Sequence, residues 1–268
     1  MPRLPAPPLP KVLLPKPKRP GDDNGNGATH NPPAEAGITV VDWIDERMSI
    51  SGGVRWMLFR KVPKGINWAY TLGSATMFAF LSQAVTGVFL AMYYRPDAAG
   101  GAYASIKDIN DNVFLGQFVH GMHKWGASVM IILIFLHMAR VFFFGAYKYP
   151  RELTWVIGVV LLILTLAEGF TGYLLPFDQK AYWATIVGVN INGTGPFIGP
   201  FLSDFLRAGP EFAATTLSRF YSIHMLIIPV AIAALIGAHL FLVTKLGISS
   251  PPWLKAEPEP ETLERAEV

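Results

Sequence analysis

Histidines gathered in two apolar segments are the feature of this sequence with the most direct chemical meaning. His120, His123 and His137 lie in one of these segments, and His224 and His239 lie in another. The sixth histidine lies in the N-terminal tail. Because an ionisable side chain is costly inside a membrane, a histidine there is a functional candidate by default.

The spacing of these histidines divides them into two pairs and one outlier. His123 and His137 are 14 residues apart, which is close to four helical turns and leaves them within about 40° of one face. His224 and His239 are 15 residues apart, about 60° off a common face. Each pair spans about 21–23 Å along its helix. His120 lies about 100° around the helix from His137, so it stands apart from the pairs.

Two helices that each present two imidazoles at matching heights are able to hold two flat ligands stacked along the membrane normal. Haem iron accepts two axial nitrogens, and a bundle interior is a normal place for such a site. A single histidine would more often be a core residue hydrogen-bonded between helices, but two pairs with nearly equal spacing argue against that interpretation. Zinc fits less well, because the pairs are too far apart for one tetrahedral ion and no thiol or acid joins them.

Glycines in two other apolar segments repeat the histidine spacing. Gly73 and Gly87 are fourteen residues apart, and so are Gly158 and Gly172. Plain helix packing by small residues more often uses a four-residue step. We therefore expect these glycines to leave gaps where the edge of a macrocycle comes close, with ordinary packing as the alternative for any one of them.

Long apolar stretches make this chain a predicted all-α membrane protein. Only 15% of its 268 residues are charged and 51% are hydrophobic, whereas soluble domains are nearer a quarter charged. Four stretches reach the roughly 20 residues that cross a bilayer core. They cover residues 65–94, 119–144, 153–177 and 220–244. The sequence predicts a bundle of four transmembrane helices with a long connection, about 178–219, before the last one.

The absence of cysteine and the small net charge exclude several classes of protein. The chain has no cysteine, which excludes disulfides, thiolate metal sites, iron–sulfur clusters and a thioether-linked haem. Its net charge is only +3, without a basic patch suited to nucleic acid. Sixteen Lys and Arg residues fall on the side of the two termini and six on the other. By the positive-inside rule, both termini of this multi-pass protein are predicted to be cytoplasmic, in the cell membrane.

The two ends of the chain differ in composition from the apolar middle. Residues 1–37 are rich in proline and are predicted to be a disordered tail. Residues 38–251 form the predicted membrane domain, which begins with an amphipathic segment, about 38–64, suited to a helix on the membrane surface. Residues 252–268 form a polar C-terminal tail.

Several long segments resemble cytochrome b, specifically the short cytochrome b6-like form that works with a separate subunit IV. The resemblance runs over about residues 41–251. The matching segments are VDWIDER, TGVFLAMYYRP, HKWGAS, LHMAR, PRELTWVIGVVL, GYLLPFDQKAYWA, LSRFYSIH and KLGISSP. It implies a four-helix dihaem bundle with two non-covalent b haems, each bound by two histidines.

The resemblance also implies roles for individual residues. His123 and His224 would hold the haem near the outer surface, and His137 and His239 the haem near the cytoplasm. Arg140 and Arg219 would meet haem propionates, and are otherwise snorkelling interface arginines. His120 and Lys124 occupy positions of family arginines and would serve the same propionates.

The segment 172–184 resembles the family's region for quinol oxidation. Its candidate quinone-binding residues are Tyr173, Pro176, Phe177, Tyr182 and Trp183. Without the resemblance, these aromatic residues would more often belong to the belt at a membrane interface. The family's Pro-Glu-Trp-Tyr segment is absent, so a partner chain is expected to complete the site.

The sequence departs from the b6 pattern at a few positions. Thr71 stands where that pattern has the cysteine that binds an extra haem covalently, so no such bond is expected. Thr244 and Trp56 replace a family arginine and acid. Glu168 stands where the pattern has an aromatic residue. One hypothesis is that Glu168 helps release quinol protons. The alternative is a structural carboxyl that contacts a histidine or the backbone.

These observations predict the cytochrome b subunit of a quinol:cytochrome c (bc/b6f-type) oxidoreductase, electron-transferring and inactive alone. The partners that the resemblance implies are a subunit IV-like chain, a Rieske iron–sulfur protein, a c-type cytochrome and a second copy of the complex. One rival is the dihaem membrane anchor of a hydrogenase or formate dehydrogenase, which would need the haems but not GYLLPFDQ. A more distant rival is a non-redox membrane subunit without haem.

Overall fold

The computed structural model describes residues 43, 45 and 63–254, and every element below lies in the unit formed by residues 61–268. Within the described residues the chain is helical and contains no strand, which confirms the predicted all-α class. The predicted tail 1–37, most of the predicted surface helix of 38–64 and residues 255–268 lie outside the described residues. Those assignments stay predictions.

Four helices are long and apolar enough to cross a membrane, as the sequence predicts. They are Trp68–Ala91, Gly116–Phe143, Glu152–Tyr173 and Ala214–Leu246. Large apolar side chains on them, such as Phe78, Val85 and Ile132, are exposed rather than packed inside. A helix that is apolar all round belongs in a membrane or a large core. The bundle interior therefore accounts for only part of the apolar sequence, and lipid or partner chains must cover the rest.

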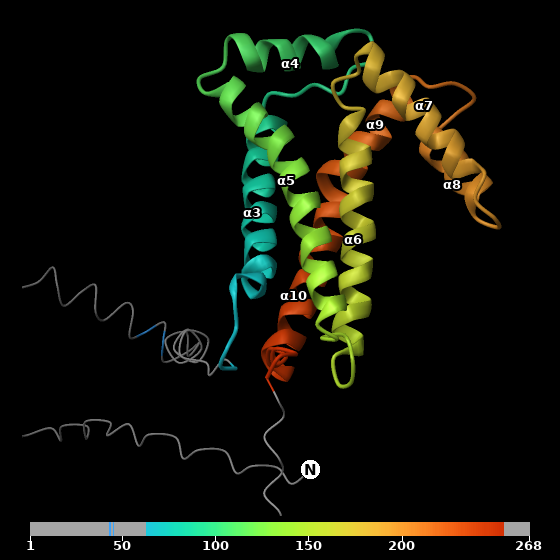
Figure 1. Cartoon of the computed structure of the whole chain (residues 1–268). Helices are drawn as coiled ribbons and strands as arrows, with labels where there is room; N and C mark the ends of the chain where they lie inside the picture. The colour runs from blue at the N-terminus through green and yellow to red at the C-terminus, as the bar shows by residue number, and fades with distance from the viewer. Residues whose placement is uncertain (1–42, 44, 46–62, 255–268) are drawn as a thin grey trace, which may run out of the picture. The chain divides into compact units, whose positions relative to one another are not determined.

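The first two membrane helices form one pair and the last two form another. A short 3₁₀ turn, Trp68–Thr71, leads into α3 (Leu72–Ala91), which packs against α5 (Gly116–Phe143). Helix α6 (Glu152–Tyr173) packs against α10 (Ile228–Leu246), which continues α9 (Ala214–Ser222) through the π-helical turn η2 (Ile223–Ile227). Figure 1 shows the four long helices running alongside one another. Each pair supplies one wall of the bundle interior.

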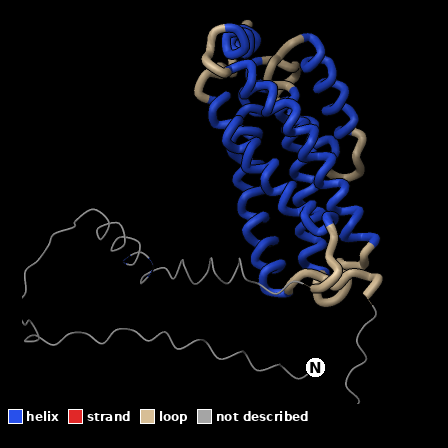
Figure 2. The backbone as a smooth tube through the Cα atoms, turned by 60° about the vertical axis from the view of Figure 1, so that its left-hand side comes forward, coloured by secondary structure: helices blue, strands red, loops and turns tan. Residues whose placement is uncertain are grey.

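Four shorter helices gather at one end of this bundle. They are α4 (Gly101–Asp111), α7 (Gln179–Gly193), α8 (Gly199–Arg207) and α9, as Figures 1 and 2 show. Helices α7 and α8 pack on each other as a hairpin within the long connection predicted after α6. Asp178 caps α7, because its side chain accepts a hydrogen bond from the Ala181 amide at 2.7 Å. The cap fixes the direction in which the chain leaves α6.

Candidate haem-binding site

The four paired histidines all line cavities between the two helix pairs. His123 on α5 and His224 on η2 line one cavity of about 170 Å³, called cavity 1. His137 on α5 and His239 on α10 line a second of about 320 Å³, called cavity 2. The structure thus brings His123 together with His224 and His137 together with His239, the pairing that the resemblance implies. Each helix pair contributes one imidazole to each cavity.

In cavity 1 the two imidazoles face each other at a separation that suits a shared metal ion. The ring centres of His123 and His224 are 6.3 Å apart, and the ring planes are nearly perpendicular, at 83°. A metal–nitrogen bond of about 2 Å on each side, the length found in zinc–histidine sites, plus the distance from each nitrogen to its ring centre, accounts for a separation of this size. The residues present therefore fit a bis-imidazole iron site.

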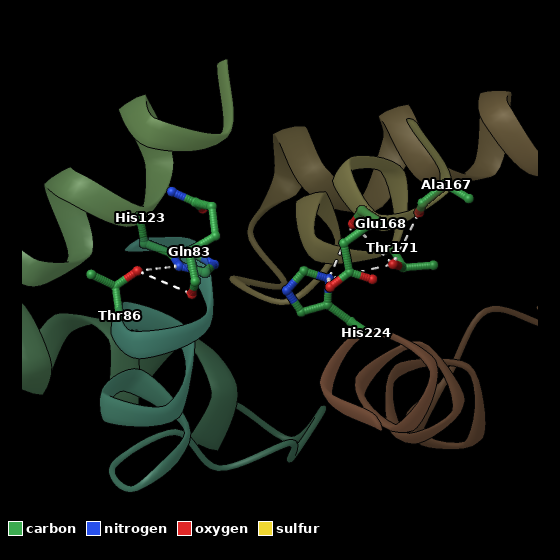
Figure 3. A network of polar contacts seen from close by, with 7 residues as sticks. All are labelled: Gln83, Thr86, His123, Ala167, Glu168, Thr171 and His224. Atoms are coloured by element: carbon green, nitrogen blue, oxygen red, sulfur yellow. Dashed lines mark hydrogen bonds and ion pairs between the residues drawn. The ribbon is translucent and has the colours of Figure 1, made fainter. Parts of the chain in front are cut away.

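Hydrogen bonding leaves the Nε2 atom of His123 free to bind a metal. The hydroxyl of Thr86 donates to the Ser82 carbonyl at 2.7 Å and lies 2.9 Å from His123 Nδ1. With its own hydrogen engaged, the hydroxyl accepts from Nδ1–H, so Nε2 carries the lone pair. With its amide turned so that the nitrogen faces α5, Gln83 donates to the His123 carbonyl at 2.9 Å. Figure 3 shows the contact between Thr86 and His123.

His224 is oriented in the same way by α6. Its Nδ1 lies 3.0 Å from the backbone carbonyl of Glu168 and 3.1 Å from the Glu168 side-chain atom Oε1. The hydroxyl of Thr171 lies 3.4 Å from the same nitrogen and donates to the Ala167 carbonyl at 3.0 Å. Because a carbonyl only accepts, Nδ1 is the donor, and Nε2 is again free (Figure 3). A ligand histidine that donates its other nitrogen to such an acceptor is typical of metal sites.

The π-helical turn corrects the histidine spacing on the last membrane helix. A regular helix would place His224 and His239 about 60° off a common face, because they are 15 residues apart. The π-turn Ile223–Ile227 contains His224 and takes up one extra residue in its turn. The two histidines are then oriented as if they were 14 residues apart, which leaves them about 40° from a common face. This equals the offset between His123 and His137, which the sequence arithmetic alone does not give.

Each of the four predicted glycines faces one of the four histidines. A Cβ built on Gly172 would lie 2.5 Å from Cε1 of His224, and one on Gly87 would lie 3.3 Å from Cε1 of His123. In cavity 2, Gly73 faces His137 at 3.2 Å and Gly158 faces His239 at 3.6 Å. In the structure the imidazole rings lie close to these glycines, so the shared 14-residue period brings each glycine to a histidine. That the gaps also admit a macrocycle edge stays a prediction.

Cavity 2 collects buried polar atoms that have no partner among the described residues. They are Tyr70 Oη, Arg140 Nε and Nη2, Thr154 Oγ1, His239 Nδ1 and Ser249 Oγ. The Arg140 guanidinium also lies 3.6 Å from the centre of the Tyr70 ring. Unpaired buried donors carry a desolvation cost, so they indicate a missing acceptor. A ligand with carboxylate groups, such as a haem with propionates, supplies one.

One residue from each long helix separates the two cavities. Phe80, Met130, Thr165 and Ile232 line both cavities. Three of these residues lie midway between two site residues of their own helix, seven positions from each. Phe80 lies between Gly73 and Gly87, Met130 between His123 and His137, and Thr165 between Gly158 and Gly172. The result is one layer of side chains between two binding spaces.

The remaining propionate candidates do not line either cavity. Lys124 is exposed on α5. Arg219 donates to the carbonyl of Phe205 on α8, and its guanidinium lies 5.0 Å from the centre of that ring. His120 Nδ1 lies 2.8 Å from Oδ1 of Asn110, which joins α5 to α4. The structure gives Arg219 and His120 structural contacts, whereas Arg140 remains beside a cavity.

The candidate quinone residues lie together where α6 meets α7. Phe177 and Tyr182 contact each other edge to face, with ring centres 5.8 Å apart, and Tyr182 contacts Trp183 at 5.3 Å. Tyr173 is partly exposed at the end of α6, and Pro176 is half-buried in the turn that follows.

A tyrosine from the other helix pair holds this turn in place. Tyr94 donates to the carbonyl of Leu175 at 2.6 Å, and it follows α3 in the chain. Burial raises the pKa of Tyr94 above its ordinary value, with a smaller contribution from Tyr221, so its hydroxyl stays a donor.

Sequence reasoning missed several residues that orient the histidines. Thr86 and Thr171 each precede a predicted glycine, so the Thr-Gly pairs 86–87 and 171–172 are a repeated signal that would have identified them. Gln83 lies one turn before Gly87 and carries no comparable signal. Two tyrosines with other roles were also missed, Tyr94, which bonds to Leu175, and Tyr70, which contacts Arg140. Both contacts join segments that are far apart in the sequence.

Comparison with known proteins agrees with this geometry. The family model described as cytochrome b/b6/petB matches residues 57–247. The chain belongs to the cytochrome b family. As a family member it is expected to bind haem b, and the absence of cysteine fits a haem that is not covalently attached.

Curated relatives match this cytochrome b over most of its length. The menaquinol:cytochrome c reductase cytochrome b subunit of Geobacillus thermodenitrificans is 43% identical over 220 residues, covering 79% of this chain and 98% of the relative. Cytochrome b6 of Heliobacterium modesticaldum is 42% identical over 213 residues, covering 79% and 100%. These relatives confirm the predicted b6-like resemblance.

A solved structure shows the same fold. A chain of a hyperthermophilic respiratory complex III aligns with a TM-score of 0.74 at 31% identity, covering 83% of this chain. The alignment covers 59% of that solved chain, so this cytochrome b spans about three fifths of its length.

Proposed function

We propose that this chain is the cytochrome b subunit of a quinol:cytochrome c oxidoreductase and holds two b haems, one in each cavity. The observation that carries the proposal is the placement of four histidines in two facing pairs, each over its own cavity. In cavity 1 both histidines engage Nδ1 in hydrogen bonds and leave Nε2 free. The curated relatives work in enzymes of this kind.

The chain's own residues bind and orient the haems. His123 with His224 and His137 with His239 would supply the axial nitrogens. Thr86 and the Glu168 carbonyl fix the ring orientation on the two sides of cavity 1. When bound, the haems supply reversible one-electron chemistry at two heights in the bundle.

The unpaired polar atoms of cavity 2 suit the charged edge of a haem. Arg140 would donate to a propionate, and the hydroxyls of Tyr70, Thr154 and Ser249 lie in the same cavity. A charged guanidinium strengthens such a hydrogen bond, because charge-assisted bonds are roughly twice as strong as neutral ones. No such cluster of unpaired donors is recorded around cavity 1 within residues 63–254.

Quinol would be oxidised at the end of the bundle that carries α7. There Tyr173, Pro176, Phe177, Tyr182 and Trp183 form an aromatic and apolar surface. The Tyr94 hydrogen bond to Leu175 holds the turn between α6 and α7 beneath it. This chain lacks the Pro-Glu-Trp-Tyr segment, so a subunit IV-like partner would complete the pocket and accept a quinol proton.

The surrounding assembly follows from the same relationship. A Rieske iron–sulfur protein and a c-type cytochrome would accept electrons on the quinol side, within a dimeric complex. By the positive-inside rule, the placement of Lys and Arg favours both termini in the cytoplasm, and the quinol side would then lie outside the cell membrane. The dihaem anchor of another enzyme is the weaker alternative, because the relatives are reductase and b6 subunits and the α6–α7 region is present.

A purified complex that contains this chain tests the function directly. Adding a reduced quinol without oxygen is expected to reduce both the b-type haem and added cytochrome c. Dithionite, which reduces haem without a quinol site, serves as the control. Haem that dithionite reduces but quinol does not, with no cytochrome c reduction, would contradict the assignment.

A further inference from the structure

Among the four histidines, His224 has a distinctive hydrogen-bond environment. Its Nδ1 lies 3.1 Å from a carboxyl oxygen of Glu168, the one pairing of a carboxyl with these histidines that the structure records within residues 63–254. The opposite ligand, His123, faces the neutral hydroxyl of Thr86 instead. In cavity 2, no carboxyl is recorded beside His137 or His239 within residues 63–254. The two cavities therefore differ in the hydrogen-bond partners of the histidines that line them.

Helix geometry puts Glu168 behind His224. Glu168 lies four residues before Gly172 on α6, so both are on the face that meets His224. Its side chain is 17% exposed and lines cavity 1 with both histidines. One oxygen, Oε1, points to His224 Nδ1, and the other, Oε2, is buried without a partner among the described residues (Figure 3). A buried carboxyl is costly unless it is hydrogen-bonded, so the histidine contact is its main compensation.

We propose that Glu168 is a positioning residue that tunes the haem held by His224, an inference that rests on the proposed function. Nδ1–H of His224 is shared between the Glu168 backbone carbonyl and Oε1, at 3.0 and 3.1 Å. Two acceptors hold the imidazole in one rotation and increase its basicity toward the iron. The oxidised, more positive iron gains most from a more basic ligand. The Glu168 side chain therefore lowers the midpoint potential of the haem in cavity 1 and leaves that of cavity 2 unchanged.

The contact does not require a particular protonation state. Oε1 has lone pairs available in both the neutral and the ionised carboxyl. A glutamine keeps an oxygen acceptor of the same shape, whereas leucine or methionine removes the acceptor and keeps an apolar side chain of similar size. This pair of changes separates the hydrogen bond from the volume of the side chain.

The experiment compares Glu168→Gln and Glu168→Leu in the purified complex by redox titration of each haem. Removing a hydrogen-bond partner of a metal-bound histidine commonly alters metal affinity by about tenfold or more. A tenfold change in the ratio of the affinities for oxidised and reduced iron is about 59 mV for one electron. We expect Glu168→Leu to raise the potential of the cavity 1 haem by about this amount, and Glu168→Gln by less than half of it. Making the changes in a His137→Leu background, which keeps only the cavity 1 haem, assigns the shift.

Three results would overturn the inference. They are no shift in Glu168→Leu, equal shifts in Glu168→Leu and Glu168→Gln, or equal shifts of both haems. Should Glu168→Leu fail to assemble, Glu168→Met gives the same comparison. The haem count separates this inference from the proposed function. Two haems with no shift reject only the role of Glu168, whereas fewer than two haems in the unsubstituted chain reject the function itself.

Discussion

Replacing His224 with leucine is expected to remove one of two haems from the complex. Leucine fills part of the space but offers no nitrogen, so cavity 1 keeps only His123 as an axial ligand. Cavity 2 keeps both of its histidines, and the layer formed by Phe80, Met130, Thr165 and Ile232 separates it from the change. The pyridine haemochrome assay should fall from two haems per chain to one, with the remaining haem spectrum preserved.

His120→Leu is the matched control for this change. His120 lies on the same helix as His123 but contacts Asn110 at 2.8 Å, and it lines neither cavity. We expect this variant to keep both haems. If His224→Leu retained both haems, or if His120→Leu lost one, the assignment of ligands would be wrong.

Gly172→Ala is expected to lower the haem content of cavity 1, although it adds a single methyl group. The new Cβ would lie 2.5 Å from Cε1 of His224, closer than real Cβ contacts allow, and 3.0 Å from Nδ1, which is a tight contact. The ring cannot move freely, because Nδ1 is hydrogen-bonded to the Glu168 carbonyl. Overpacking of this kind costs about 1–3 kcal/mol. Alanine favours a helix by about 1 kcal/mol over glycine, so any loss has to come from the contact.

Gly158→Ala provides the comparison on the same helix. Its Cβ would lie 3.6 Å from Cε1 of His239, an ordinary van der Waals distance. We expect this variant to keep the haem of cavity 2, or to gain slightly in stability from the better helix former. The measurement is haem per chain after purification, together with the thermal midpoint. Equal losses in the two variants would show that the short distance at Gly172 does not control His224.

The sequence was sufficient to predict the framework of the site. The apolar stretches are long enough to cross a membrane, so they predict membrane helices, and the structure has four helices of this kind among the described residues. The 14- and 15-residue histidine spacings reflect helix periodicity, so they predict two imidazoles at matching heights on each helix. The resemblance then implies the pairing of His123 with His224 and of His137 with His239 that the structure contains. Both inferences depend on local regularity, which a sequence records directly.

Features that depend on irregular backbone or distant contacts could not be predicted in the same way. The π-turn around His224 changes the helix register, and nothing in the segment IHMLI marks it. Arg219 contacts the Phe205 carbonyl on α8, because the long connection folds back onto α9. A contact of Glu168 with a histidine was one of the two alternatives that the sequence offers. Its partner His224 could be named only once Gly172, one turn away, was known to face that histidine.

A haem count on the complex purified with this chain tests the central claim most directly. A reduced-minus-oxidised spectrum combined with the pyridine haemochrome assay measures both the type of haem and its amount per chain. The account predicts two b haems for each copy of the chain, both low-spin and bound by paired histidines. A colourless subunit, or one with a single haem per chain, would contradict it.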